Sequence, residues 1–308
     1  MNFHFAPVQG HTDAPYRHFH SEVYGGALKH YTPFIRLEKD GIRQRDVKDY
    51  TSQLNRNIDL TPQIIFRDKR ELETLITQLR EKGISSIDLN MGCPFPLQTG
   101  HGRGAATIGN NELAHAVVES VQGNPDITFS VKMRLGLENK EEWRGLIPYL
   151  NKLKLSHITL HPRTARQQYG GEIDFEQFGL FLKESNNPVV YNGDLRTPED
   201  ITKIIDSYPD ISGVMIGRGL LGRPSLMAEY LSGAEWPEDK RKQKMLEFHR
   251  LLLNHYQENL CGEAQIISKI SPFWEYAEAE IGRKGWKAIR KASNMAKYNS
   301  AVGMIANS

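Results

Sequence analysis

Eight short apolar segments alternate with longer amphipathic segments between residues 3 and 216 of this 308-residue chain. Each apolar segment ends in a polar or glycine-containing loop. Continuous apolar runs of this kind are typical of parallel strands that are buried on both faces. The predicted strands are Phe3–Val8, Leu28–Thr32, Pro62–Phe66, Ser86–Asn90, Thr128–Met133, His157–His161, Pro188–Asn192 and Gly213–Ile216.

The segments between these strands carry the hydrophobic period of amphipathic helices. Helices are predicted over 70–82, over 111–121, over 141–153 with a kink at Pro148, and over 174–183. Thr197 is predicted to cap a further helix, because a proline and two acidic residues follow it. Eight strands with such connections predict an α/β fold, a (β/α)8 TIM barrel, with a doubly wound sheet as the alternative. Residues 34–60 are irregular and polar and are predicted to include an insertion.

The pattern changes after Trp236. Beyond that point three helices and no strand are predicted: Lys240–Tyr256, Ile266–Ile281 with a break or kink at Pro272, and Gly285–Tyr298. The sequence therefore predicts a barrel domain at 1–236 and a small all-helical domain at 237–308. From residue 238 onward there are 12 Lys and Arg against 8 Asp and Glu, and no acidic residue follows Glu280. The excess positive charge of the chain thus gathers in its last quarter.

Composition bounds the class of protein. Hydrophobic residues make up 39% of the chain and charged residues 25%, which is ordinary for a soluble globular protein. The chain starts without a basic segment and an apolar run, and no apolar run is long enough to span a membrane. We therefore expect neither a signal peptide nor a membrane partner. Two cysteines cannot form a disulfide framework, so a reducing cytoplasm is the simplest expectation. We also expect a monomer.

Basic side chains follow two neighbouring predicted strands. Lys132 and Arg134 lie two residues apart on one strand, and His161 and Arg163 do so on the next. Lys and Arg inside buried strands are costly unless they are paired, so two such pairs predict an anionic ligand in the barrel mouth. The loops after the last two strands, Asn192-Gly193 and Gly217-Arg218-Gly219, have the glycines that let backbone N–H groups approach phosphate. A phosphorylated cofactor or substrate is therefore predicted.

One of the two cysteines lies where the fourth predicted strand ends, in Asp88-Leu-Asn-Met-Gly-Cys-Pro94. In an α/β protein, catalytic residues gather at such strand ends, although a small buried cysteine in a turn is the common alternative. The histidines His11 and His161 lack the spacing of metal-binding motifs and have no second cysteine nearby, so we expect no metal.

Taken together, these motifs resemble the tRNA-dihydrouridine synthases, a bacterial FMN-dependent family. The Asn-x-Gly-Cys-Pro element is the most specific part, and the helical tail looks like the family's C-terminal domain. A lysine that is common in the family shortly after the Cys-Pro is missing here. The matching elements are Ala6-Pro-Val-Gln-Gly-His-Thr-Asp13, Pro62-Gln-Ile-Ile65, Asp88–Pro94 with residues 100–106, Val131-Lys-Met-Arg134, Thr159-Leu-His-Pro-Arg-Thr164 with Tyr169-Gly-Gly171, Pro188-Val-Val-Tyr-Asn-Gly-Asp194 and Val214-Met-Ile-Gly-Arg-Gly219.

The resemblance implies an enzyme that reduces the C5=C6 bond of a D-loop uridine in tRNA, with FMN as cofactor and NADPH as reductant. Lys132 would lie near the flavin ring and stabilise its reduced form, and Cys93 would donate a proton to C5. The positions that match the family's cofactor contacts are Ala6, Pro7, Val8, Gln63, Lys132, His161, Asn192, Gly193, Asp194, Gly217 and Arg218.

On the substrate side, Asn90 matches a position that contacts the target base, and Arg134 and Arg163 are the candidates beside it. Arg36 resembles a basic position of the subgroup that acts on position 16. Lys284, Lys287 and Lys291 recur at helical spacing and are predicted to contact tRNA phosphates. Two alternatives stay open: an FMN barrel oxidoreductase acting on a small pyrimidine-like substrate, and a non-catalytic RNA-binding barrel.

Overall fold

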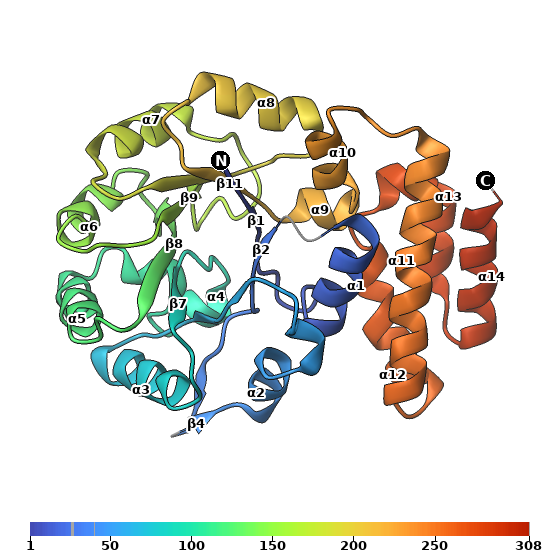
Figure 1. Cartoon of the computed structure of the whole chain (residues 1–308), viewed down its shortest axis with the longest axis horizontal. Helices are drawn as coiled ribbons and strands as arrows, with labels where there is room; N and C mark the ends of the chain where they lie inside the picture. Colours follow the sequence, from blue (N-terminus) through green and yellow to red (C-terminus); the bar gives the residue numbers. More distant parts are fainter. Residues whose placement is uncertain (26–27, 40, 308) are drawn as a thin grey trace.

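The computed structural model describes residues 1–25, 28–39 and 41–307, and in it parallel strands form a barrel surrounded by helices (Figure 1). Residues 26, 27, 40 and 308, which fall inside the two predicted domains, lie outside the described residues. The strands of the barrel are β1 (Asn2–Phe5), β2 (Lys29–Tyr31), β5 (Leu60–Thr61), β6 (Gln63–Ile64), β7 (Ser86–Met91), β8 (Thr128–Gly136), β9 (Ile158–Thr164), β10 (Val189–Asn192) and β11 (Gly213–Ile216).

The barrel closes at Pro62. The order of neighbouring strands is β5-β2-β1-β11-β10-β9-β8-β7-β6, so the sheet begins and ends on two strands that Pro62 alone separates. Proline has no backbone N–H and interrupts the ladder there, while β5 pairs with β2 and β6 pairs with β7. Counting β5 and β6 as one strand, every predicted strand is confirmed, and so is the TIM-barrel fold class.

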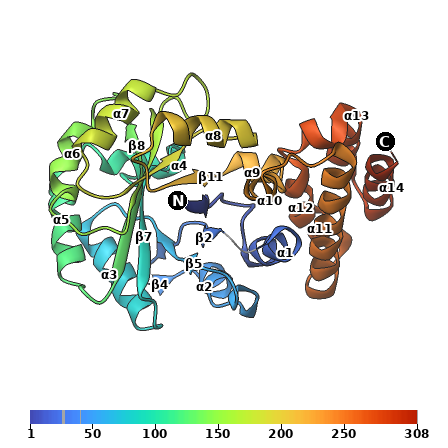
Figure 2. The same cartoon turned by 45° about the horizontal axis from the view of Figure 1, so that its top comes forward.

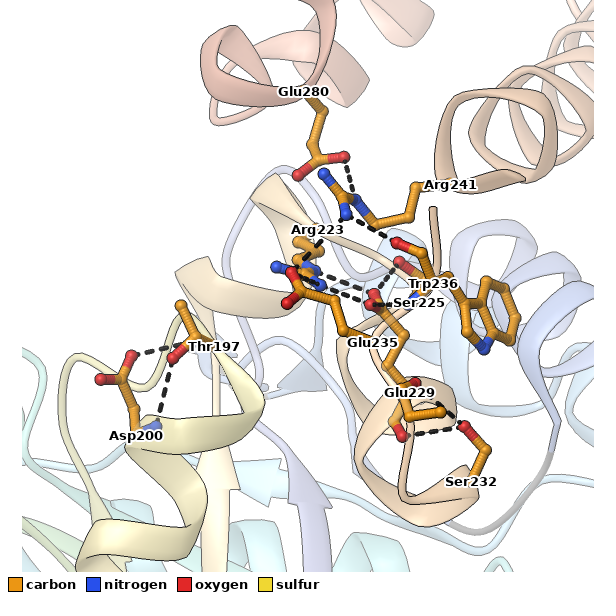
Figure 3. A network of polar contacts seen from close by, with 11 residues as sticks. Thr197, Asp200, Arg223, Ser225, Glu229, Ser232, Glu235, Trp236, Arg241 and Glu280 are labelled. Atoms are coloured by element: carbon orange, nitrogen blue, oxygen red, sulfur yellow. Dashed lines mark hydrogen bonds and ion pairs between the residues drawn. The ribbon is translucent and has the colours of Figure 1, made fainter. Parts of the chain in front are cut away.

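Helices connect the strands and cover the outside of the barrel (Figure 1). The Asp68 side chain caps α3. Thr197 caps α8, as predicted, and forms a reciprocal capping box with Asp200 (Figure 3). Pro148 lies inside the short helix α6, and the kink expected there stays a prediction. The helices of this part are α1 (Ala14–Tyr24), α2 (Gln44–Tyr50), α3 (Lys69–Arg80), α4 (Pro96–Thr99), α5 (Asn111–Gln122), α6 (Trp143–Leu150), α7 (Phe175–Glu184), α8 (Pro198–Ser207), α9 (Arg218–Gly222) and α10 (Leu226–Ser232).

The region 34–60 is more ordered than its sequence predicts. It contains a small antiparallel pair, β3 (Leu37–Glu38) and β4 (Gly41–Ile42), followed by α2 and a 3-10 turn at Gln53–Asn55. Strands of two residues are too short to show the alternation from which a strand is predicted.

Four helices pack on one side of the barrel, at the orange and red end of the chain in Figures 1 and 2. They are α11 (Glu238–Asn259), α12 (Glu263–Ile270), α13 (Glu278–Lys291) and α14 (Met295–Ala306). The break expected at Pro272 is present, since α12 ends at Ile270 and a 3-10 turn, Ser271–Trp274, follows. The single helix predicted over Gly285–Tyr298 is wrong, because Asn294 caps a new helix by accepting a hydrogen bond from the Lys297 backbone.

A polar cluster joins these helices to the barrel (Figure 3). The Glu229 carboxylate, on α10, is fully buried and accepts hydrogen bonds from Arg223 and from the backbone N–H of Trp236, the latter at 2.8 Å. Arg241, on α11, donates to the Trp236 carbonyl at 2.8 Å and to Glu280 of α13 at 2.9 Å. The two parts also share apolar contacts, and the division at 236/237 stays a prediction.

Candidate active site

A cavity of about 330 Å³ lies at the carboxyl ends of the strands. This is where barrel enzymes bind their ligands, because the loops that follow all strands meet there. Fourteen of the residues predicted from the sequence line it: Ala6, Pro7, Val8, Gln63, Asn90, Cys93, Lys132, Arg134, His161, Asn192, Gly193, Asp194, Gly217 and Arg218. The cofactor and catalytic sets are therefore brought together at one place.

Cys93 is held at the end of β7 by its neighbours in the chain. Its backbone N–H donates to the Asn90 Oδ1 atom at 2.9 Å, and the N–H of Gly92 donates to the same oxygen at 3.2 Å. Gly104 has φ +60°, and a Cβ there would lie 2.6 Å from the Cys93 carbonyl, so glycine alone allows this contact. Burial raises the pKa of the Cys93 thiol. The thiol is therefore protonated at neutral pH.

Lys132 presents its ammonium to the same cavity. Its Nζ donates to Asn192 Oδ1 at 2.9 Å, and Asn192 Nδ2 in turn donates to the Met215 carbonyl at 2.7 Å. Burial, helped by the charge of Arg134, lowers the pKa of Lys132 to about 8. The lysine is still mostly charged at neutral pH, so it can stabilise negative charge that develops beside it.

The β10 and β11 ends form a compact turn around Asp194. The Asp194 carboxylate accepts from Arg163 at 2.5 Å and from Arg218 at 2.8 Å. Burial alone would raise the pKa of Asp194, but these two guanidinium groups outweigh it and the pKa is lowered. A Cβ at Gly219 would lie 1.9 Å from the Leu195 carbonyl, so the turn into α9 requires glycine. Gly217, Arg218 and Gly219, at the start of α9, all line the cavity.

Several cavity residues were not predicted. Two guanidinium groups lie over the ring of Tyr169, with the Cζ atoms of Arg218 and Arg134 at 4.2 Å and 5.4 Å from the ring centre. His11 lines the cavity from the β1–α1 loop, and its Nε2 lies 3.3 Å from Glu275. Glu275 and Tyr276 come from the helical part of the chain. Tyr169 belongs to a motif visible in the sequence, whereas nothing in the sequence places the helical part over the barrel mouth.

Five predicted substrate residues lie outside the cavity lining. Arg163 is buried behind it, where it donates to Asp194 and to the Gly171 carbonyl at 2.8 Å. Arg36 is half-buried beside β6. The last three, Lys284, Lys287 and Lys291, are exposed on α13. The structure thus separates a pocket from a basic surface on the helical part.

The comparisons with known proteins agree with this arrangement. The family model described as dihydrouridine synthase matches residues 4–288. The chain belongs to the dihydrouridine synthase family. A probable tRNA-dihydrouridine synthase of Rhodobacter capsulatus is 27% identical over 96% of this chain and 93% of its own length, and one of Bacillus subtilis, named synthase 2, is 26% identical over 89% and 83%.

Solved structures share the fold at low identity. Morphinone reductase gives a TM-score of 0.54 with 11% identity over 76% of this chain and 86% of its own, and the old yellow enzyme of Trypanosoma cruzi gives 0.54 with 9% identity over 77% and 89%. The family membership makes the chain an enzyme and confirms the resemblance predicted from its motifs. Within the described residues, no helix has the length and apolarity to cross a membrane, and no group of three or more metal-ligating side chains is gathered.

Proposed function

We propose that the protein is a tRNA-dihydrouridine synthase that reduces the C5=C6 bond of a D-loop uridine with FMN and NADPH. The observation that carries the proposal is the placement of a neutral thiol, Cys93, and an ammonium, Lys132, on the walls of one cavity in a chain of this family. A thiol that stays protonated is suited to donate a proton rather than to act as a nucleophile.

The cavity fits FMN. Its charged lining is mainly cationic, because it has four cationic residues, Lys132, Arg134, Arg196 and Arg218, and two acidic ones, Asp194 and Glu275. Gly217, Arg218 and Gly219 line the cavity at the start of α9, where backbone N–H groups could bind a phosphate. Lys132, Gln63 and His161 would hold the ring, and Arg218 the phosphate. When bound, FMN would supply the hydride that C6 of uracil receives.

The protein's own groups would complete the reduction. As C6 gains the hydride, the Cys93 Sγ–H bond breaks and its proton goes to C5; solvent then reprotonates the thiolate. Asn90 and Arg134 line the cavity near Cys93 and are the candidates for holding the base. Arg163 and Arg36, which do not line it, would act on the substrate only indirectly or outside the pocket.

The substrate would be tRNA rather than a free pyrimidine. Extruding a base costs a few kcal/mol, which phosphate contacts elsewhere must offset. The exposed lysines of α13 could supply them. Glu275 and Tyr276 also bring the helical part to the cavity rim, so a substrate that reaches the pocket passes that part. We further propose that the enzyme works in the cytoplasm as a monomer with separate barrel and helical domains at 1–236 and 237–308.

Deleting the gene and mapping dihydrouridine across cellular RNA tests the proposal. We expect the loss of one D-loop dihydrouridine, at position 16 if Arg36 indicates the subgroup. The purified protein, supplied with FMN and NADPH, should restore that nucleotide in tRNA from the deletion strain. An unchanged dihydrouridine map would refute the proposed function.

A further inference from the structure

Asp88 is the first residue of the Asp-Leu-Asn-Met-Gly-Cys motif, and the proposed chemistry gives it no role. Its side chain is fully buried on β7. Its two oxygens accept hydrogen bonds from different strands: Oδ2 from Gln63 Nε2 at 2.7 Å, and Oδ1 from the Ser130 hydroxyl at 2.5 Å. A carboxylate without water is costly, so its place between two neutral donors calls for a physical reason.

The hydrogen bonds continue from Asp88 toward the cysteine. Gln63 Oε1 accepts from Asn90 Nδ2 at 2.7 Å, and Asn90 Oδ1 accepts the backbone N–H groups of Gly92 and Cys93. Asp88 and Asn90 are two residues apart and so lie on the same face of β7. Three consecutive hydrogen bonds therefore run from the buried carboxyl group to the backbone of Cys93.

The direction of every link is fixed by the two ends. Both oxygens of Asp88 accept, so Gln63 turns its NH2 group toward Asp88 and its oxygen toward Asn90. A backbone N–H can only donate, so Asn90 must turn its oxygen toward Cys93 and its NH2 group toward Gln63. Flipping either amide would set two donors or two acceptors against each other in a dry site.

We propose that Asp88 is a positioning residue that holds the Cys93 loop through Gln63 and Asn90. It does not line the cavity, and it acts by selecting the one amide orientation of Gln63 and Asn90 that anchors the Cys93 backbone. This rests on the proposed function insofar as Cys93 is the proton donor. The anchoring itself is a property of the protein and can be measured without turnover.

Two substitutions separate the hydrogen-bond direction from the charge. Asp88→Asn removes the charge but can still accept from Gln63 and meet Ser130, so the direction is kept. Asp88→Leu has a similar volume, removes the charge and removes the acceptor. Thr159→Val serves as the control, because Thr159 is also fully buried on a barrel strand, and its hydroxyl has no hydrogen-bond partner.

The first readout is the rate of Cys93 alkylation by iodoacetamide against pH in the FMN-loaded protein. It is measured in a Cys261→Ser background, because Cys261 is an exposed free cysteine. We expect Asp88→Asn and Thr159→Val to keep the wild-type profile and Asp88→Leu to shift it. The second readout is single-turnover uridine reduction in tRNA, which Asp88→Leu should slow about 10- to 100-fold relative to Asp88→Asn, with equal NADPH-dependent flavin reduction in the two variants.

Three outcomes would overturn the proposal. Equal losses in the Asn and Leu variants would mean that the charge of Asp88 matters rather than the direction of its hydrogen bonds. Wild-type profiles and rates in both would mean that Asp88 has no influence on Cys93. If the Leu variant does not fold, a shifted alkylation profile in Asp88→Asn alone contradicts the proposal. A wild-type protein that alkylates normally but never reduces tRNA would refute the proposed function and leave the anchoring intact.

Discussion

Lys132→Met should stabilise the flavin-free protein. Lys132 is half-buried in the wall of the cavity, and its ammonium donates to a neutral amide, Asn192. Burial lowers its pKa from 10.5 to about 8. At about 1.4 kcal/mol per unit of pKa, this fall corresponds to about 3 kcal/mol by which the charged lysine destabilises the folded protein. Losing the hydrogen bond to Asn192 costs about 1 kcal/mol, so the net gain near neutral pH should be about 2 kcal/mol.

The gain should disappear at alkaline pH. Between about pH 8 and 10.5 the unfolded chain keeps the Lys132 proton that the folded protein releases. The unfolded state then binds more protons, so the stability of the wild type rises with pH in this window. By about pH 9.5 the wild type should have recovered about 2 kcal/mol, and the advantage of Lys132→Met should have fallen to nearly zero.

Urea unfolding of the flavin-free protein, followed by tryptophan fluorescence near pH 7 and near pH 9.5, measures both values. Lys183→Met is the matched control, because Lys183 is exposed on α7 and should give no such difference. A variant that is no more stable than the wild type near pH 7, or one whose advantage persists unchanged near pH 9.5, would refute the reasoning. The flavin-free form is needed because a bound anion would pair with the ammonium.

Three further predictions concern the site. Cys93→Ala should leave NADPH-dependent flavin reduction unchanged and slow uridine reduction at least about 100-fold, measured by single turnover; equal losses in both steps would contradict the acid role. Replacing Lys284, Lys287 and Lys291 with Ala should weaken tRNA binding and reduce the salt slope of log K by about 2 to 3, and an unchanged slope would place the RNA surface elsewhere. Gly219→Ala should weaken FMN binding, measured by flavin fluorescence, because its Cβ would meet the Leu195 carbonyl; Gly145→Ala, which meets no atom, is the control.

The strands were predictable because their residues are mostly apolar. The elements whose bounds or existence were not predicted have physical causes. β11 has the predicted bounds, but β8 extends to Gly136 instead of Met133. The extra residues begin at Arg134, whose charged side chain ends the apolar pattern because it lines the cavity instead of packing in the core. Helix α1 was missed because its buried face includes Arg17, which donates to the Thr12 carbonyl at 2.6 Å and to Asp49 at 3.0 Å. In a sequence pattern, an arginine is assigned to the exposed face of a helix even when it is buried and paired.

The site was predictable as far as strand order determines it. Residues at the ends of parallel strands must meet at one end of a barrel, which is why most of the predicted set lines one cavity. Contacts made by loops and by the helical part depend on packing over long sequence distances. For that reason Tyr169, His11 and Tyr276 were missed. The alternation that predicted Arg163 on the cavity side failed for a different reason, because Asp194 draws its guanidinium behind the lining.

Asp88 and Lys132 are oppositely charged side chains inside the barrel whose hydrogen bonds go to other, neutral groups. Each is hydrogen-bonded to neutral groups, yet the charge of Asp88 raises the pKa of Lys132 and so opposes the effect of burial. Asp88 therefore has two separable effects: its charge keeps Lys132 protonated, and its acceptor atoms fix the amides that hold Cys93. Asp88→Asn removes the first effect alone. The variant should lose NADPH-dependent flavin reduction at a lower pH than the wild type, while its Cys93 alkylation profile stays in place, and a joint shift of both would show that the two effects cannot be separated.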